Sequence, residues 1–134
     1  MTPQDRARKS ANLMFASDSA SRGLGMAITD IGPGHAVLQM KVRADIFTLA
    51  DSAFAFACNS YNQLVVAQQN QITYVAPGQE GELLTATATE TSRTGRSGVY
   101  DVTVTGEDGR TVALFRGLSR TIKGQHFDEE GTPA

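Results

Sequence analysis

One acidic residue lies in the most apolar stretch of the chain. Asp51 is the only charged residue between Phe47 and Asn62, a segment rich in alanine, phenylalanine and leucine. A carboxylate among apolar side chains carries a desolvation cost unless it has a partner or a chemical role. Two interpretations are open. Asp51 is either a general base or nucleophile in a hydrolytic reaction, or a structural acid in the first turn of a helix, where the helix dipole stabilises negative charge.

The segment around Asp51 has the composition of a buried helix. It contains no glycine or proline, its alanines favour helix formation, and apolar residues occupy nearly its whole circumference. We therefore predict a helix over 47–62 that is enclosed by protein. Positions eleven apart fall on nearly the same face of a helix, so Asp51 and Asn62 are expected to line up roughly with Ala55.

Three other polar or reactive side chains on this helix suggest structural roles. Ser52 is expected to bond back to the helix, and Asn59 to lie at the helix end or to touch a neighbouring subunit. Cys58 is interpreted as a small core residue, because no basic neighbour would lower the pKa of its thiol. Since it is the only cysteine, no intrachain disulfide can form, and a reducing cytoplasm is the expected compartment.

The composition excludes several classes of protein. Hydrophobic residues make up 40% of the 134 residues and charged residues 19%, which is ordinary for a soluble globular protein. The net charge of −2 is spread along the chain, so a nucleic-acid binder with a basic face is not expected. No apolar run approaches the ~20 residues of a membrane span. His35 and His126 are far apart and expected to be solvated, so we predict no metal ion.

The rest of the sequence predicts short elements and a single domain over residues 1–134. A helix is expected from Pro3 to about Ser17, and the tail is polar from about residue 124 and expected to fray. Strands before one buried helix, followed by consecutive antiparallel strands, indicate an α+β fold in which a curved sheet wraps the helix. Alternating apolar residues predict the strands Met26–Ile31, His35–Val42, Leu64–Val75, Glu82–Ser92, Val99–Thr105 and Thr111–Ile122.

Two polar stretches are candidates for ligand contact. In the strand segment 68–71, alternate side chains, Asn70 among them, line either a pocket or a subunit interface, or else form one solvated face. The glycine-rich turn 93–98 carries Arg93, Arg96 and Ser97. The forked donors of arginine suit phosphate groups, and the alternative is an ordinary surface hairpin.

Four segments together resemble the phenylacetate-degradation (PaaI-type) branch of the hot-dog acyl-CoA thioesterases. The resemblance runs from about Met26 to Lys123, with the elements in the family's order and spacing. It is carried by FTLADSAFAFACNS (47–60), QITYVAPGQEGE (71–82), GVYDVTV (98–104) and TVALFRGLSR (111–120).

The resemblance implies a fold, an activity and an assembly. The fold is a sheet around a central helix, with a short N-terminal helix added here. Homodimers joined edge to edge, often paired into homotetramers, carry the active sites at the subunit interface. The activity is hydrolysis of acyl-CoA, typically hydroxylated phenylacetyl-CoA, with the carboxylate at the position of Asp51 as base or nucleophile. Coenzyme A enters as part of the substrate, so no separate cofactor is expected.

The same resemblance implies a ligand-binding role for the two polar stretches. Coenzyme A has an anionic nucleotide end, which Arg93, Arg96 and Ser97 are suited to bind. Asn70 is the candidate of the other stretch for contact with the substrate.

One departure from the family concerns the chain before the helix. The family carries a loop with an Asn-Gly-His…His-Gly-Gly pattern that resembles an oxyanion hole, whereas here Asp45 and Ile46 run straight into Phe47. Natural deletion, engineering or an incomplete sequence would each shorten this connection. Because a single oxyanion donor contributes about 10²–10³-fold in turnover, the rival hypothesis is a non-catalytic acyl-CoA binder or a structural hot-dog protein.

Overall fold

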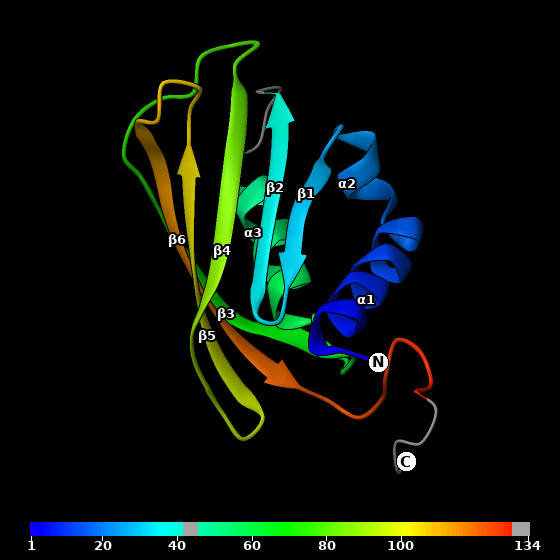
Figure 1. Ribbon diagram of the computed structural model, residues 1–134. Helices are drawn as coiled ribbons and strands as arrows, with labels where there is room; N and C mark the ends of the chain where they lie inside the picture. Colours follow the sequence, from blue (N-terminus) through cyan, green and yellow to red (C-terminus); the bar gives the residue numbers. More distant parts are fainter. Residues whose placement is uncertain (42–45, 130–134) are drawn as a thin grey trace.

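Six strands form one curved antiparallel sheet within the described residues, 1–41 and 46–129 of a computed structural model (Figure 1). The strand order is β1-β2-β4-β5-β6-β3, so β1 and β3 are the two edges. The strands are β1 (Ala27–Gly32), β2 (His35–Lys41), β3 (Val65–Tyr74), β4 (Leu83–Thr94), β5 (Ser97–Thr105) and β6 (Thr111–Thr121), and the helices are α1 (Pro3–Ser17), α2 (Ser19–Gly23) and α3 (Ile46–Cys58). The predicted α+β fold with a sheet wrapped around one helix is confirmed.

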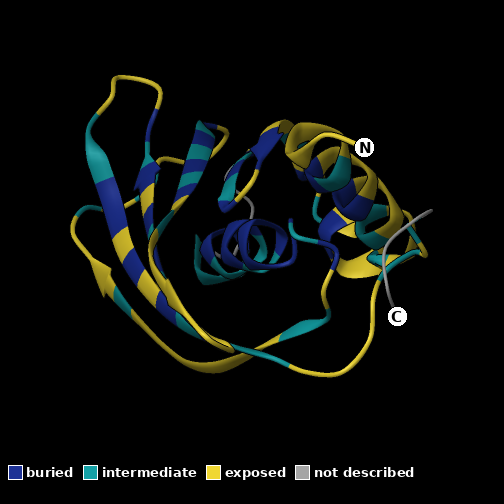
Figure 2. Ribbon diagram, turned by 60° about the horizontal axis from the view of Figure 1, so that its bottom comes forward, coloured by how far each residue is buried: buried dark blue, intermediate teal, exposed yellow. Residues whose placement is uncertain are grey.

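The alternation read from the sequence decides which side of the sheet is covered. On β4, Leu84, Ala86 and Ala88 are fully buried, while the threonines between them point to the convex side. On β5 the residues with the same orientation, including Tyr100 and Val102, are buried as well. Figure 2 shows α3 inside the curve of the sheet, and α3 contacts both β4 and β5, so these buried residues belong to the concave face.

Close packing holds α3 inside the curve of the sheet. The Phe54 ring lies 5.8 Å from the rings of both Tyr100 and Phe115, centroid to centroid. It also rests against the backbone of Gly117, where an added Cβ would lie 2.6 Å from ring carbons. A side chain at position 117 would therefore push the helix away from β6.

The predicted helix ends earlier than expected. It stops at Cys58, and Asn62 adopts a left-handed backbone conformation with φ of 58°. The expected alignment of Asp51 with Asn62 is therefore wrong, because Asn62 is no longer on the helix. The short helix α2 was not predicted, since its five residues carry too little periodicity to be recognised.

The turn between β4 and β5 is tighter than predicted. The two strands continue through the glycine-rich segment and pair Arg93 with Gly98 and Thr94 with Ser97. Only Gly95 and Arg96 remain in the turn, and Gly95 takes a positive φ of 60°. Of the residues predicted to form the turn, Arg93, Ser97 and Gly98 therefore belong to the strand ends.

The expectation of a frayed tail from about residue 124 is wrong for residues 124–129. The Asn62 side chain accepts hydrogen bonds from the backbone amides of His126 and Phe127 and donates to the Phe127 carbonyl and the Glu129 carboxylate. Arg6 on α1 then pairs with Glu129. These bonds fasten the segment beside the start of α1 (Figure 1).

Candidate active site

The apolar helix α3 is not covered on all sides. Ala50, Ala53, Phe54 and Ala57 are buried against the sheet, whereas one stripe of the helix is only half-buried. The residues of this open stripe are Phe47, Thr48, Asp51, Ser52 and Ala55. The prediction of an enclosed helix therefore holds for the sheet side, and the one acid of the helix lies on the side that remains open.

Asp51 faces the β3 edge of the sheet. Phe54 touches Tyr100 on β5 and Phe115 on β6, and Phe47 touches only Phe115 of these two. Around the helix axis, Phe47 follows Phe54 by about 20°, and Asp51 follows Phe47 by about 40° in the same sense. Because β3 is the next strand after β6, this rotation turns Asp51 toward β3.

Desolvation sets the acidity of Asp51. Partial burial raises the pKa of the Asp51 carboxyl above its ordinary value. A carboxyl with a raised pKa is a stronger base than an exposed one, which favours the removal of a proton from water. The chemical interpretation of this acid therefore gains a physical basis that its sequence position alone did not provide.

Asn70 shares the open side with Asp51. In the pairing of β3 with β6, Asn70 lies opposite Gly117 and Ile72 lies opposite Phe115. Directly opposite residues in an antiparallel pair point to the same face. Since Gly117 and Phe115 face the helix, Asn70 and Ile72 do so too, and β3 extends past the helix so that Asn70 is exposed.

The three other candidate residues lie at the end of the sheet that is far from the start of α3. Figure 1 shows the β4–β5 hairpin at one end of the sheet and the start of α3 toward the other. Arg93, Arg96 and Ser97 belong to this hairpin, and the Arg93 guanidinium stacks 3.6 Å from the centroid of the Tyr61 ring. One chain therefore does not bring these residues to Asp51.

Ser52 does not bond back to the helix as expected. Its hydroxyl lies 3.1 Å from that of Ser21 on α2, and the Ser21 hydroxyl donates to the Asp18 carboxylate at 2.7 Å. Because Ser21 has only one hydroxyl proton, Ser52 is the donor to Ser21. This link between α2 and the helix of Asp51 was missed, since residues 31 positions apart show no signal in a single sequence.

Asn59 connects the end of α3 to β3 and to the tail. It lies just after the last residue of the helix, which is one of the two positions predicted for it. Its side-chain amide donates to the Val65 carbonyl at 3.1 Å and accepts from the Val65 backbone amide at 3.0 Å. Its side-chain oxygen also contacts His126 Nε2 at 3.0 Å. The prediction of a solvated His126 is wrong, because the ring is half-buried and desolvation lowers its pKa.

The thiol of Cys58 is unsuited to nucleophilic catalysis. Burial raises its pKa to about 12, so the reactive thiolate is scarce at neutral pH. Its expected role as a core residue is confirmed by its burial. No cluster of three or more His, Cys, Asp or Glu residues in the described part of the chain could hold a metal ion. In the same residues, no helix is long and apolar enough to cross a membrane.

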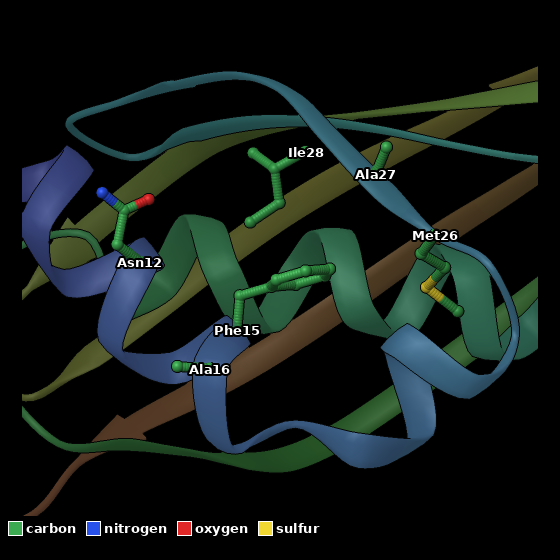
Figure 3. A pocket seen from close by; sticks show the side chains of 6 residues that line it. All are labelled: Asn12, Phe15, Ala16, Met26, Ala27 and Ile28. Atoms are coloured by element: carbon green, nitrogen blue, oxygen red, sulfur yellow. The ribbon is translucent and has the colours of Figure 1, made fainter.

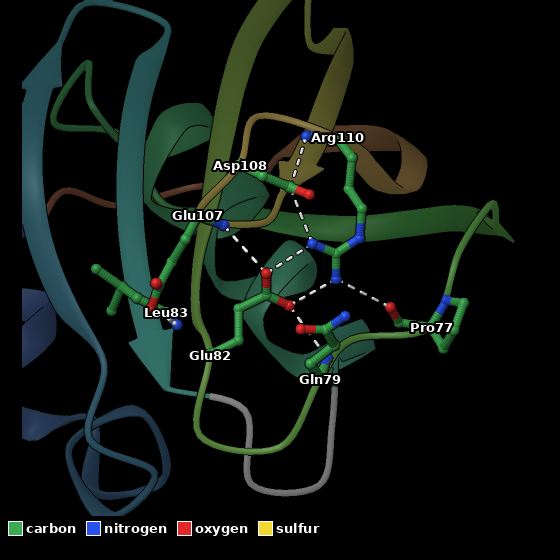
Figure 4. A network of polar contacts seen from close by, with 7 residues as sticks. All are labelled: Pro77, Gln79, Glu82, Leu83, Glu107, Asp108 and Arg110. Atoms are coloured by element: carbon green, nitrogen blue, oxygen red, sulfur yellow. Dashed lines mark hydrogen bonds and ion pairs between the residues drawn. The ribbon is translucent and has the colours of Figure 1, made fainter.

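A polar network fastens the loops beside the end of the sheet where α3 begins (Figure 4). Arg110 donates to both oxygens of the Glu82 carboxylate at 2.7 Å and to the Pro77 carbonyl at 3.2 Å. The Arg110 guanidinium lowers the pKa of Glu82 to about 2. The network joins the segment before β4 to the β5–β6 hairpin.

A second opening lies away from Asp51. A groove of about 420 Å³ runs between α1 and β1 and is lined mainly by apolar side chains, with Phe15, Met26 and Ile28 the largest (Figure 3). Because β1 is the sheet edge opposite to β3, we do not assign this groove to the candidate site. The connection predicted to be shortened, before Phe47, falls on residues 42–45, which lie outside the described residues.

Comparison with known proteins finds relatives among thioesterases and esterases. Residues 44–113 match the family described as the thioesterase superfamily. The acyl-coenzyme A thioesterase PaaI of Escherichia coli is 37% identical over 131 residues, covering 89% of this chain and 94% of that protein. A putative esterase of Archaeoglobus fulgidus is 31% identical over 116 residues, covering 78% of this chain and 75% of that protein.

Solved structures agree with the sequence relatives. The E. coli PaaI protein from the phenylacetic acid degradation operon superposes with a TM-score of 0.89 at 36% identity, covering 92% of this chain and 99% of that one. A mutant of the phenylacetic acid degradation protein PaaI from Thermus thermophilus gives 0.73 at 33% identity, covering 78% and 100%. The hot-dog fold implied by the sequence resemblance is confirmed.

Proposed function

Because this chain belongs to the thioesterase superfamily and is a thioester hydrolase, we propose that it hydrolyses acyl-CoA substrates with an aromatic acyl group, of the phenylacetyl or hydroxyphenylacetyl type. The observation that carries the proposal is the half-buried Asp51 carboxylate on the open stripe of α3, facing the β3 edge. The names of the E. coli and T. thermophilus relatives refer to phenylacetic acid degradation, which supports an aromatic acid as the product.

Asp51 acts on the thioester in one of two ways. As a general base it takes a proton from water while the water oxygen attacks the thioester carbonyl carbon, and the tetrahedral intermediate then expels coenzyme A as its thiol. As a nucleophile it attacks the carbonyl itself, releases the thiol and forms an anhydride that water opens. Its raised pKa supports either route, because desolvation makes the carboxylate both a stronger base and a stronger nucleophile.

An apolar surface beside Asp51 is suited to an aromatic ring. Phe47 is half-buried on the open stripe and meets Phe115 edge to face at 5.8 Å between centroids. Ile72 lies opposite Phe115 on the same concave face. An aromatic acyl group whose carbonyl is at Asp51 would pack against these side chains and bury apolar area from water.

A second copy of the chain completes the site in this proposal. The β3 strand is an edge of the sheet, with Val66 45% and Tyr74 61% exposed. Such an edge offers free backbone groups for pairing with another strand. Two copies joined antiparallel through β3 form a homodimer, which can pair further into a homotetramer, and the open stripe of α3 then lies at the subunit interface.

Antiparallel pairing also implies a ligand-binding role for the β4–β5 hairpin, the basic hairpin that carries Arg93 and Arg96. A twofold axis between the β3 strands brings the hairpin end of one copy toward the end of the sheet where α3 of the other copy begins. Arg93, Arg96 and Ser97 of one copy would then bind the phosphates of a coenzyme A whose thioester lies at Asp51 of the other. Asn70 contacts the acyl part of the same substrate.

Other properties of the protein follow from the same proposal. Residues 1–134 form a single hot-dog domain that works in the cytoplasm, without a metal ion and without a cofactor other than the coenzyme A of the substrate. Its partners are acyl-CoA and further copies of itself, and neither nucleic acid nor a membrane is among them. The oxyanion donor that the resemblance implies has no counterpart in the sequence before Phe47, and no residue is assigned to that role.

A thiol-release assay with the unaltered protein tests the proposed function. Phenylacetyl-CoA and 4-hydroxyphenylacetyl-CoA should be hydrolysed with a higher kcat/KM than acetyl-CoA or a long aliphatic acyl-CoA. Isothermal titration with the same thioesters runs beside it. Binding without hydrolysis would contradict the proposal and favour a non-catalytic acyl-CoA binder, and a preference for aliphatic substrates would contradict the aromatic acyl group.

A further inference from the structure

An exposed cation stacks on a half-buried ring near the β4–β5 hairpin. The Arg93 guanidinium lies 3.6 Å from the centroid of the ring of Tyr61, which belongs to the segment after α3. Three other arginines, Arg6, Arg110 and Arg116, form ion pairs with carboxylates. Arg93 has no such pair among the described residues, so no acid of the protein in direct contact neutralises its charge.

A β-bulge in β4 brings Arg93 to the same face of the sheet as Glu90. Residues three positions apart on a regular strand point to opposite faces. The register of β4 with β5 shifts between Glu90 and Ser92, however, which inserts one extra residue. Glu90 then lies opposite the buried Tyr100, and Arg93 opposite the buried Gly98. Tyr100 and Gly98 are two residues apart on β5 and share the concave face. Their partners on β4 therefore point there too.

The carboxylate of Glu90 fixes the Tyr61 ring against Arg93. One oxygen of Glu90 accepts from the Tyr61 hydroxyl at 3.0 Å and from the Tyr100 hydroxyl at 2.8 Å. Burial and the Glu90 carboxylate raise the pKa of Tyr61, so its hydroxyl stays protonated and continues to donate. Gly34 makes room for this arrangement, because an added Cβ there would lie 2.8 Å from the Tyr61 hydroxyl. The ring is therefore held by the same strand that carries Arg93.

Stacking orients a guanidinium without using its hydrogen-bond donors. The face of the guanidinium lies on the ring, whereas its N–H groups point outward from the edge. A phosphate can accept two of these N–H groups at once. A freely moving arginine loses side-chain entropy when it binds a phosphate, and a guanidinium already held against a ring has lost part of that entropy beforehand. The arrangement therefore suits a ligand that carries phosphate groups.

We propose that Tyr61 is a positioning residue that holds Arg93 for the phosphates of coenzyme A. This role rests on the proposed function, in which Arg93 of one copy meets the coenzyme A whose thioester lies at Asp51 of the other. A twofold axis between antiparallel β3 strands passes through the joined sheet, so the concave faces of both copies lie on the same side. Arg93 therefore lies on the side of the joined sheet where the other copy carries α3.

Tyr61 should affect the binding of coenzyme A thioesters and not the chemical step. Ordering one long side chain on binding lowers affinity by roughly 3- to 10-fold. Tyr61→Leu should therefore raise the KM of phenylacetyl-CoA by about 3- to 10-fold, with kcat nearly unchanged. The N-acetylcysteamine thioester of phenylacetate lacks the nucleotide, so Tyr61→Leu should leave its kcat/KM unchanged. Tyr61→Phe keeps the ring, and its KM for phenylacetyl-CoA should stay close to that of the unaltered enzyme.

A double-mutant cycle with Arg93→Leu tests whether Tyr61 acts through Arg93. Arg93→Leu alone should raise the KM of phenylacetyl-CoA. Adding Tyr61→Leu to that variant should raise the KM no further, because the group that the ring positions is already gone. Phe127→Leu is the matched control. It removes a ring whose centroid lies 4.3 Å from the Lys9 ammonium, in the tail beside α1, and it should leave the KM unchanged.

The other outcomes separate this role from the proposed function. An unchanged KM in Tyr61→Leu overturns the role and leaves the proposed function intact. An equal loss for both thioesters also overturns it, because that result describes a general distortion, and so does an equal rise in KM with and without Arg93. If the unaltered protein hydrolyses neither thioester, the proposed function fails. Isothermal titration of free coenzyme A then tests the role alone: weaker binding by Tyr61→Leu supports it, and unchanged binding overturns it.

Discussion

At the scale of the residue, Asp51 could be selected as a candidate from sequence because charge is rare among so many apolar neighbours. The orientation of its side chain could not. That orientation depends on which side of the helix is covered by the sheet. Contacts such as that of Phe47 with Phe115 decide this, and they exist only after folding. Asn70 was equally ambiguous in sequence, since the choice between a pocket and a solvated face depends on its register with Gly117.

The raised pKa of Asp51 also has a consequence for stability. A carboxyl whose pKa is higher in the folded state binds its proton more tightly there, so its ionisation disfavours folding as pH rises above the unfolded value. Asp51→Asn should therefore raise the Tm at pH 7 relative to the unaltered protein. The difference should shrink as pH falls below ~4, where the carboxyl is protonated in both states.

Thermal unfolding followed by circular dichroism at pH 7 and near pH 3 measures this effect. Ser52→Ala is a useful control for the pH dependence, because it removes the hydrogen bond to Ser21 but no titratable group, so its Tm difference should be the same at both pH values. A lower Tm of Asp51→Asn at pH 7 would mean that the carboxylate makes a stabilising contact, which contradicts its description as a desolvated acid.

At the scale of the element, the strands were predicted within a few residues because alternation of side chains is a local signal. The fastening of residues 124–129 was not, since it depends on the Asn62 side chain bonding to backbone groups more than 60 positions away. Polar composition usually indicates a loose end, and here the same polar groups make the contacts. Ser21 and Ser52 are a second case of a long-range polar link without a sequence pattern.

Asn62 supplies a test of this tail attachment. Asn62→Ala removes the hydrogen bonds to His126, Phe127 and Glu129, and it also leaves a residue with a Cβ at φ of 58°. Leaving such buried groups without partners costs roughly 1–3 kcal/mol in free energy of unfolding. Denaturant unfolding should therefore show a clear loss of stability.

Asn62→Gly separates the two causes. Glycine adopts the left-handed conformation without strain, so this variant should lose only the side-chain bonds and be less destabilised than Asn62→Ala. If both variants unfold at the same denaturant concentration as the unaltered protein, the tail is not held by Asn62.

At the scale of the whole molecule, the proposed site needs two chains. The open stripe of α3 and the free edge of β3 lie on the same side, and the basic hairpin lies at the far end of its own chain. No sequence pattern predicts that the site is shared between two chains, because this follows from the position of β3 at the end of the strand order. A structure with β3 in the middle of the sheet would leave the open stripe without a free edge beside it.

Val66 provides a test of the assembly. It is exposed on the β3 edge, and Val66→Lys would place a charged side chain on that edge, which disfavours pairing with the β3 strand of another copy. Analytical ultracentrifugation should show the unaltered protein as a dimer or tetramer and Val66→Lys shifted toward the monomer, with hydrolysis reduced in proportion. The matched control is Leu114→Lys, which is similarly exposed but lies on β6 away from the edge. A monomeric and fully active unaltered protein would contradict the interface-built site.

The most direct test of the proposed site is the turnover of phenylacetyl-CoA by Asp51→Ala beside its binding of the same thioester. We predict that hydrolysis falls by at least about 100-fold, as expected when a general base or nucleophile is lost. Binding measured by isothermal titration and the circular dichroism spectrum should stay close to those of the unaltered protein. Near-normal hydrolysis by Asp51→Ala would contradict the assignment of Asp51 as the group that acts on the thioester.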